Sequence, residues 1–260
     1  MSEELVVNLS LVTVHDFLFF ASQDYGATAR PASVIGNYSL MYAMNRSLSG
    51  VRRLASGTRP HYEEDLPLMP VYATPASPVT RFPRPETARL ASDHWSRRPV
   101  RIGDVRAGGW QDRRLVKITW NSTGESLLDK MAKDRANLPK KGAYYKHPPL
   151  TTFYFYAVGG PLPKVFRLGK KYTPVRAQYY PIAMKRREGE FEPTCPVNVI
   201  DLPPDTEILR GSILTVPPAP VLTTCRLRGV YYEGGDESGL VHRIPEPNIE
   251  RFRSSWVWGA

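Results

Sequence analysis

The sequence predicts an α+β fold in which antiparallel β-strands predominate over helices. Three observations lead to this prediction. The 260 residues include 25 prolines, which interrupt long helices and suit short strands joined by turns. Short apolar or alternating segments recur through the second half of the chain, separated by Gly and Pro. Only two segments have the periodicity of an amphipathic helix. The hydrophobic content of 42% is enough for a packed core, and no composition shift marks a boundary, so we predict a single domain over residues 1–260.

The first 112 residues are expected to form a strand, a helix and an irregular insertion. Residues 4–14 alternate between apolar and polar side chains and predict a half-buried strand. An apolar stripe over residues 37–47 predicts a short helix capped by Asn37. Residues at about 48–112 contain eight prolines between Pro60 and Pro99. We therefore expect a large irregular Pro-rich insertion on the core, with short extended pieces such as 69–74.

The remainder is expected to contain one strand, one helix and then a series of β-hairpins. Residues 113–120 alternate as a strand does, and residues 126–137 have the clearest amphipathic pattern, which Pro139 ends. Further strands are predicted at 151–158, 164–168, 175–184, 197–201, 213–216 and 222–232. The predicted turns are Gly159-Gly160-Pro161, Gly169, Glu188-Gly189, Pro203-Pro204, Pro217-Pro218 and Gly234-Gly235.

The net charge of +10 is concentrated in the middle of the chain. Residues 1–80 carry a charge of −2, residues 81–187 carry +17 and residues 188–260 carry −5. No acidic residue occurs between Asp134 and Glu188, a stretch of 53 residues with 12 Lys and Arg. Like charges repel in a compact chain, so this stretch predicts a polyanionic partner such as a phosphate backbone. The alternative is a solvated basic face that binds no ligand.

Aromatic residues are interleaved with these cations, among them Tyr144, Tyr145 and Tyr172. Exposed rings stack on bases while Lys and Arg hold phosphates, so the combination favours a nucleic acid. In residues 151–158 the alternate rings are expected to face the core instead, as β-propensity predicts.

Motifs for catalysis, metal binding or cofactor binding are missing from the sequence. It contains no phosphate-binding loop, no nucleophile elbow and no Cys/His cluster with metal-ligand spacing. Two groups still permit an enzymatic hypothesis. His15-Asp16 is either an acid–base pair or the end of a strand. Tyr145-Lys146-His147 is either a metal-independent site for RNA cleavage through a 2′-hydroxyl or part of a rigid connector.

The expected compartment is the cytoplasm. No apolar run is long enough to span a membrane. The N-terminus lacks the basic region of a signal peptide. The two cysteines provide no disulfide framework, which suits a reducing environment.

Several segments, taken in order, resemble one protein family. The first is His15-Asp16-Phe17-Leu18-Phe19-Phe20-Ala21-Ser22, followed by Gly26 and by Asn37-Tyr38-Ser39-Leu40-Met41-Tyr42-Ala43. The later ones are Tyr72-Ala73-Thr74-Pro75-Ala76, Phe166-Arg167-Leu168-Gly169-Lys170-Lys171, Val197-Asn198-Val199-Ile200-Asp201-Leu202 and the stretch from Pro217-Pro218 to Leu227-Arg228-Gly229. They resemble the CRISPR-associated Csc-one family, the Cas-five-type subunit of type I-D interference (Cascade) complexes.

The resemblance implies an RRM-like, or ferredoxin-like, core of the RAMP superfamily with an inserted arm. It implies a non-catalytic subunit, without metal or cofactor, that holds the 5′ handle of the CRISPR RNA and caps the foot of an antiviral ribonucleoprotein complex. The neighbours would be a Cas-seven-type backbone subunit and a Cas-ten-type large subunit, with target DNA nearby. The chain departs from the pattern in one respect, because a glycine-rich RAMP loop has only Gly229, Gly234, Gly235 and Gly239 as counterparts. The aromatic motifs of ordinary RRMs are also missing.

The predicted RNA contacts are the cations of the acid-free stretch that lie near its turns and strands. They are Lys140, Lys141, Lys146, Lys164, Arg167, Lys170, Lys171 and Arg176. One alternative is an endonuclease that processes precursor CRISPR RNA through His147. Another is a module that contacts duplex DNA near the PAM through Arg81, Arg84, Arg97, Arg98 and Arg101 of the insertion.

Overall fold

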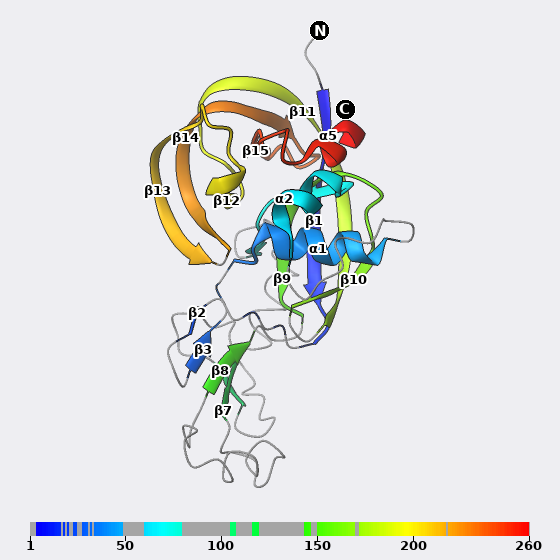
Figure 1. Ribbon diagram of the computed structural model, residues 1–260, viewed down its shortest axis with the longest axis vertical. Helices are drawn as coiled ribbons and strands as arrows, with labels where there is room; N and C mark the ends of the chain where they lie inside the picture. The colour runs from blue at the N-terminus through cyan, green and yellow to red at the C-terminus, as the bar shows by residue number, and fades with distance from the viewer. Residues whose placement is uncertain are drawn as a thin grey trace.

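The structure is a computed structural model that shows mostly antiparallel β-sheet and few helices (Figure 1). It describes residues 4–16, 18, 20, 23–24, 28–30, 32, 34–48, 60–79, 105–107, 116–119, 143–146, 150–169, 172–216 and 218–259. The predicted α+β class is thereby confirmed in its coarse form. The predicted helix at 126–137 and most of the Pro-rich insertion lie outside these residues.

The larger sheet has ten strands, and all neighbours in it are antiparallel. Along its main path the order is β12 (Val197–Asn198), β14 (Ala219–Gly235), β11 (Thr173–Phe191), β1 (Glu4–Val14), β9 (Thr152–Gly159) and β4 (Val71–Ala73). Four strands pair beside this path: β10 (Val165–Leu168) with β11, β13 (Glu207–Val216) and β15 (Val241–Pro245) with β14, and β5 (Ser77–Pro78) with β9.

The buried side chains of β1 lie on one face of the sheet in the first half of the strand and on the other face in its second half. Leu5, Val7 and Leu9 are buried on one face near the start of β1, whereas Val12 and Val14 are buried on the opposite face near its end. Because successive side chains of a strand point to opposite faces, the cover must change sides along the sheet. Half of each face is therefore left to solvent.

Two long strands curve away from the core and form an arm. β11 pairs with β1 over its first part and with β14 over its last part, and Figure 1 shows β11, β13 and β14 curving around β12. The predicted turn at Glu188-Gly189 is wrong because β11 runs through it. Gly189 adopts φ +139 opposite Gly229 at φ +158, which lets both strands bend without breaking. The predicted turn at Gly234-Gly235 also lies inside a strand, β14.

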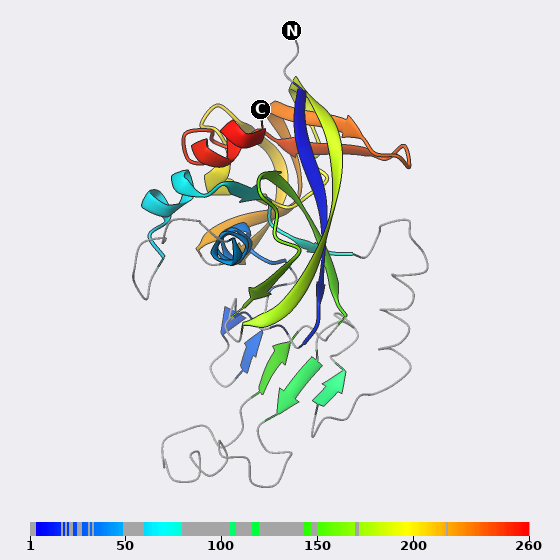
Figure 2. The ribbon, with the colours of Figure 1, turned by 90° about the vertical axis from the view of Figure 1, so that its right-hand side faces the viewer.

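A smaller sheet lies at the end of the molecule away from both termini (Figures 1 and 2). Its order is β2 (Gln23–Asp24), β3 (Thr28–Arg30), β8 (Ala143–Lys146), β7 (Val116–Thr119) and β6 (Val105–Ala107), and β3 and β8 are parallel. The strand predicted at 113–120 is confirmed over the described residues of β7. The segment that carries Tyr144 and Tyr145 is the strand β8.

The helices are α1 (Asn37–Ser47), α2 (Tyr62–Asp65) and α5 (Arg253–Gly259), with 3-10 turns η1 (Leu66–Leu68) and η2 (Val199–Asp201). The bounds predicted for α1 are confirmed, but its cap is Gly36 rather than Asn37. The strand predicted at 197–201 is wrong beyond Asn198, where η2 begins. The strand β15 and the helix α5 were not predicted. None of the described helices is long and apolar enough to cross a membrane.

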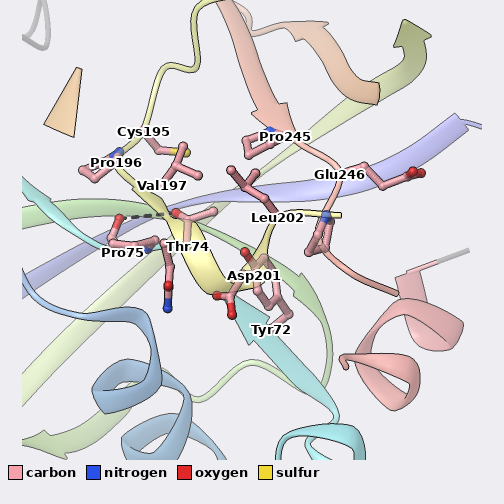
Figure 3. A pocket seen from close by; sticks show the side chains of 12 residues that line it. Tyr72, Thr74, Pro75, Cys195, Pro196, Val197, Asp201, Leu202, Pro245 and Glu246 are labelled. Carbon is pink, nitrogen blue, oxygen red and sulfur yellow. Dashed lines mark hydrogen bonds between the residues drawn. The ribbon is translucent and has the colours of Figure 1, made fainter. Parts of the chain in front are cut away.

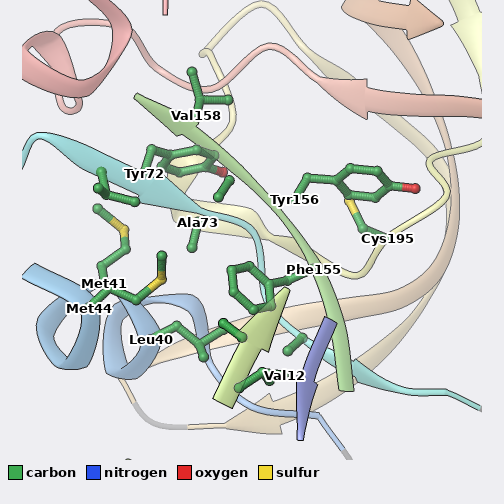
Figure 4. Packing of buried hydrophobic residues seen from close by; sticks show 14 of the residues in the cluster. Val12, Leu40, Met41, Met44, Tyr72, Ala73, Phe155, Tyr156, Val158 and Cys195 are labelled. Atoms are coloured by element: carbon green, nitrogen blue, oxygen red, sulfur yellow. The ribbon is translucent and has the colours of Figure 1, made fainter. Parts of the chain in front are cut away.

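The core lies on both sides of β9. Figure 4 shows Leu40, Met41 and Met44 of α1 close to Phe155, while Tyr156, the next residue of β9, points the opposite way toward Cys195. All six side chains are fully or almost fully buried. The helix α1 thus covers one face of the sheet, as Figure 2 shows with α1 seen end-on.

Candidate nucleic-acid interface

The structure describes three of the eight predicted RNA contacts with their side chains. Lys164 lies in the bend before β10, Arg167 lies in β10 and Arg176 lies in β11, and all three are exposed. Lys146 is the last residue of β8. The others lie outside the described residues: Lys140, Lys141, Lys170 and Lys171, together with the proposed DNA contacts Arg81, Arg84, Arg97, Arg98 and Arg101.

The hairpin of β10 and β11 brings Arg167 and Arg176 to the same face of the sheet. Val165 is paired with Arg176, and Arg167 is paired with Pro174, so the two arginines are diagonal neighbours across the hairpin. The residues that alternate with them, such as Phe166, are buried on the side of α1. The alternation of the sequence therefore places both guanidinium groups on the side opposite that helix.

The loop of this hairpin is held by its own backbone and by Arg167. Gly169 and Tyr172 adopt positive φ angles of 75° and 52°, and the Tyr172 N–H donates to the Gly169 carbonyl at 3.1 Å. The Arg167 Nη1 donates to the Tyr172 carbonyl, also at 3.1 Å. The Tyr172 ring is 62% exposed, and such a ring beside cations suits stacking on a base. Lys170 and Lys171 lie between these residues in the sequence.

The described cations of the hairpin have no carboxylate partner, whereas most arginines later in the chain have one. Five of the six arginines after residue 188 pair with glutamates: Arg210 with Glu192, Arg226 with Glu190, Arg228 with Glu190 and Glu207, Arg243 with Glu233, and Arg251 with Glu63. Of the six described cations between 164 and 187, Arg186 alone has such a partner, Glu246 at 3.0 Å. Within the described chain, Lys164, Arg167 and Arg176 of the hairpin therefore have no carboxylate partner, and neither do Lys185 and Arg187 further along β11.

The first enzymatic hypothesis gains no support from its surroundings. His15 and Asp16 lie exposed in the bend after β1. The His15 N–H donates to the Pro174 carbonyl at 3.0 Å and so extends the pairing of β1 with β11. This geometry is that of a strand end. His147, which the second enzymatic hypothesis requires, lies outside the described residues.

A buried chain of hydrogen bonds that the sequence did not predict joins β9 to β15. The Tyr156 hydroxyl lies 2.6 Å from His242 Nδ1, and His242 Nε2 lies 3.1 Å from an oxygen of Asp236. Burial raises the pKa of Tyr156, while the Ser238 hydroxyl is the main cause that lowers the pKa of Asp236 to about 2. Tyr156 and His242 are almost fully buried, so we interpret this chain as a structural link.

A second buried cluster joins two of the segments that carry the family resemblance. Asp201 accepts hydrogen bonds from Asn37 Nδ2 and from the Tyr38 hydroxyl, both at 2.5 Å, and Asn198 Nδ2 donates to Asn37 Oδ1 at 2.9 Å. Burial is the main cause that raises the pKa of Asp201 to about 6. The only signal for this contact in the sequence is the presence of polar residues in apolar surroundings.

A small pocket lies next to this cluster, and part of a third such segment lines it. Figure 3 shows Tyr72 and Thr74 of that segment around the pocket with Asp201 and Cys195. Thr74 and Asp201 already accept hydrogen bonds from the Tyr156 N–H and the Tyr38 hydroxyl, and among the described residues no group of three or more His, Cys, Asp or Glu is placed to hold a metal. These segments therefore hold α1, β4 and η2 together, and the exposed hairpin is the better candidate site.

The sequence was compared with protein families and with curated proteins. The family model described as type I-D CRISPR-associated protein Cas5/Csc1 matches residues 7–248. No curated protein matches the chain.

Proposed function

The chain belongs to the type I-D CRISPR-associated Cas5/Csc1 family, and from this premise we propose that it is the non-catalytic subunit that holds the 5′ handle of the guide RNA. Membership places the chain in a type I-D CRISPR complex, in which a guide RNA and other subunits are the expected partners. The proposal adds that this subunit caps the foot of the complex, beside a Cas-seven-type backbone subunit and a Cas-ten-type large subunit. We also propose that the antiparallel sheet belongs to an RRM-like core of the RAMP superfamily.

One observation carries the RNA-binding part of the proposal, namely the three cations of the β10–β11 hairpin without a carboxylate partner. When an unpaired surface cation neutralises a phosphate of a nucleic acid, the counterions bound to that phosphate are released, and their release adds to the affinity. In the arm, by contrast, glutamates of neighbouring strands form ion pairs with Arg226 and Arg228. The exposed Tyr172 ring adds a surface for a base beside them.

The salt dependence of handle RNA binding tests this proposal. The logarithm of the affinity should fall with the logarithm of the salt concentration, by about 0.7 per phosphate contact on a single strand. The double variant Arg167→Ala/Arg176→Ala should flatten that slope by about 1.4. Arg226→Ala/Arg228→Ala removes the same charge from the arm and is the matched control. A slope near zero for the wild type, or equal flattening in both double variants, would contradict the proposal.

The absence of catalysis is a separate part of the proposal and has its own test. Precursor CRISPR RNA incubated with the full chain in EDTA should remain intact, because we assign cleavage to another subunit. Appearance of a cut product that His147→Ala abolishes would replace this part of the proposal with a metal-independent endonuclease.

A further inference from the structure

We infer that the face of β10, β11, β1 and β9 opposite α1 is a platform on which unpaired bases of the guide lie. The inference rests on the proposed function and extends it from phosphate contacts at the hairpin to base contacts on the sheet. We call this surface the open face. It consists of the exposed and half-buried side chains of two rows that cross the four strands.

The register of the strands defines the first row. Val165 is paired with Arg176, Arg176 is paired with Thr13, and Thr13 is paired with Thr152. Residues paired directly in an antiparallel sheet point to the same face. A hydrogen bond of 3.1 Å between the hydroxyls of Thr13 and Thr152 agrees with this. With neighbouring strands about 4.8 Å apart, four strands make a row about 14 Å wide.

The second row lies two residues further along the strands, about 7 Å away. It contains Gln178, Leu11 and Tyr154, which are paired in the same way. The Tyr154 hydroxyl donates to the Thr194 carbonyl at 3.2 Å, which anchors the ring at one side of the row. A sheet surface of this size is comparable to the one on which RRM domains stack two or three bases.

The open face ends where the core begins. In the next row Leu9 is paired with Tyr156, and both are buried, because the segment of Thr194 and the strand β15 cover them. Leu11, only two residues away, is half-buried. The surface therefore changes from covered to open within one step of the strand, and a bound strand of RNA has a defined edge to lie against.

The chemistry of the open face fits a single strand of nucleic acid. Its two rows and the flanking Arg167 contain no carboxylate, and Arg176 has no acidic partner among the described residues. Val165 is 65% exposed, so an apolar side chain lies in water next to the guanidinium group. A nucleotide satisfies both, because its base presents an apolar ring face and its phosphate presents a negative charge. The Gln178 amide can donate to and accept from a base edge.

The opposite face of the same sheet provides a matched control. Val6 of β1 is 50% exposed, similar to Val165, but it occupies the alternate position of the strand and faces away from the open face. Substitution of either valine by serine removes an exposed apolar group from a strand and leaves the core untouched. The two variants therefore differ in the face that they alter.

The experiment measures binding of the full chain to single-stranded handle RNA at several salt concentrations. Val165→Ser and Leu11→Ser should each raise the Kd about fivefold or more, as expected for a weakened base contact. Neither should change the salt slope, because neither residue contacts a phosphate. Val6→Ser should bind as the wild type does. Ultraviolet crosslinking to 4-thiouridine-substituted handle RNA should label peptides of β1, β9, β10 or β11.

The outcomes separate this inference from the proposed function. If the wild type binds, Arg167→Ala/Arg176→Ala flattens the slope and Val165→Ser and Leu11→Ser bind normally, the proposed function stands and the platform is wrong. Equal loss in Val6→Ser, or crosslinks confined to other strands, also overturns the platform. If a protein subunit protects the open face in the assembled complex while no base crosslinks there, the surface is a protein interface instead. No salt-dependent binding by the wild type overturns both.

Discussion

Replacement of Asp201 by asparagine tests how the protein compensates for a buried carboxyl. Asp201 is 3% exposed and accepts hydrogen bonds from Asn37 and Tyr38. Burial has the largest influence and raises its pKa from 3.8 to about 6, because the charged form loses its hydration. The two hydrogen bonds and the nearby Arg251 act in the opposite direction without cancelling it.

The raised pKa determines how stability depends on pH. In the unfolded chain Asp201 ionises near its ordinary value of 3.8, whereas in the folded protein it ionises near 6. Between these values the folded state binds more protons than the unfolded state, so the free energy of unfolding falls as pH rises. Above pH 6 the decrease is complete. A difference of about two pKa units corresponds to about 3 kcal/mol.

The assay is urea denaturation of the wild type and Asp201→Asn at intervals from pH 4 to 7.5. Asparagine does not titrate, so the difference in the free energy of unfolding between the two proteins isolates Asp201 from all other groups. The wild type minus the variant should decrease by about 2.4 kcal/mol from pH 4 to pH 7, because the remainder of the difference develops below pH 4. Asp205→Asn, in an exposed position four residues away, is the matched control and should follow the wild type.

Two results would refute the reasoning. A difference that is constant over this range would mean that Asp201 has the same pKa in both states, so that burial and hydrogen bonds cancel. A difference that increases with pH would mean that the Asn37 and Tyr38 hydrogen bonds, with Arg251, outweigh burial. In the second case the cluster would stabilise the charged carboxylate, and in either case burial would not be the dominant influence on the pKa of Asp201.

Three further predictions concern stability, and urea denaturation at neutral pH checks each. Gly159→Ala should cost about 3 kcal/mol or more, because φ is +86 and the new Cβ would lie 2.2 Å from the Pro70 carbonyl oxygen; Gly160→Ala, which meets nothing closer than 4.0 Å, should cost less. Tyr156→Phe should cost about 1–3 kcal/mol, since it leaves a buried histidine nitrogen without the hydroxyl at 2.6 Å. Arg186→Ala should cost about 1.5–3 kcal/mol, because it removes the two hydrogen bonds to a glutamate that is 10% exposed; unchanged midpoints would contradict each prediction.

The elements with simple periodicity could be predicted from the sequence, and the curved arm could not. The bounds of β1 and α1 were predicted correctly because the apolar side chains of each follow a regular period, although the buried face of β1 changes between Leu9 and Val12. The turn predicted at Glu188-Gly189 was wrong for a physical reason. A glycine next to a charged residue indicates a turn in isolation, but here Gly189 lies opposite Gly229, and the pair bends two strands that remain hydrogen-bonded. That pairing spans 40 residues of sequence, so no local pattern contains it.

The segments that carry the family resemblance contribute to the core of the fold, whereas a functional motif would be expected to line a binding site. Asn37 and Tyr38 were expected to start a helix, and Asp201 to end a strand. Instead their side chains meet in the core, 164 and 163 residues apart in the sequence. A buried polar side chain in an apolar helix is expected to have a hydrogen-bond partner, but only the fold shows which residue that partner is. The hydrogen bonds to Asp201 therefore explain why Asn37 and Tyr38 are polar, which the sequence pattern alone does not.

The structure shows which of the charged residues have partners of opposite charge. The sequence predicted a polyanion from a stretch of 53 residues without acid, and a solvated face was the less favoured alternative. Strand register distinguishes them, because it pairs Glu190 with Arg228 in the arm and leaves Arg176 opposite Val165 and Thr13 in the hairpin. If cations were placed only for solubility, both regions would be expected to interleave their charges in the same way. The described cations of the hairpin lack a carboxylate partner, whereas Arg226 and Arg228 of β14 in the arm are paired with Glu190 of β11, and this contrast favours a negatively charged ligand at the hairpin end.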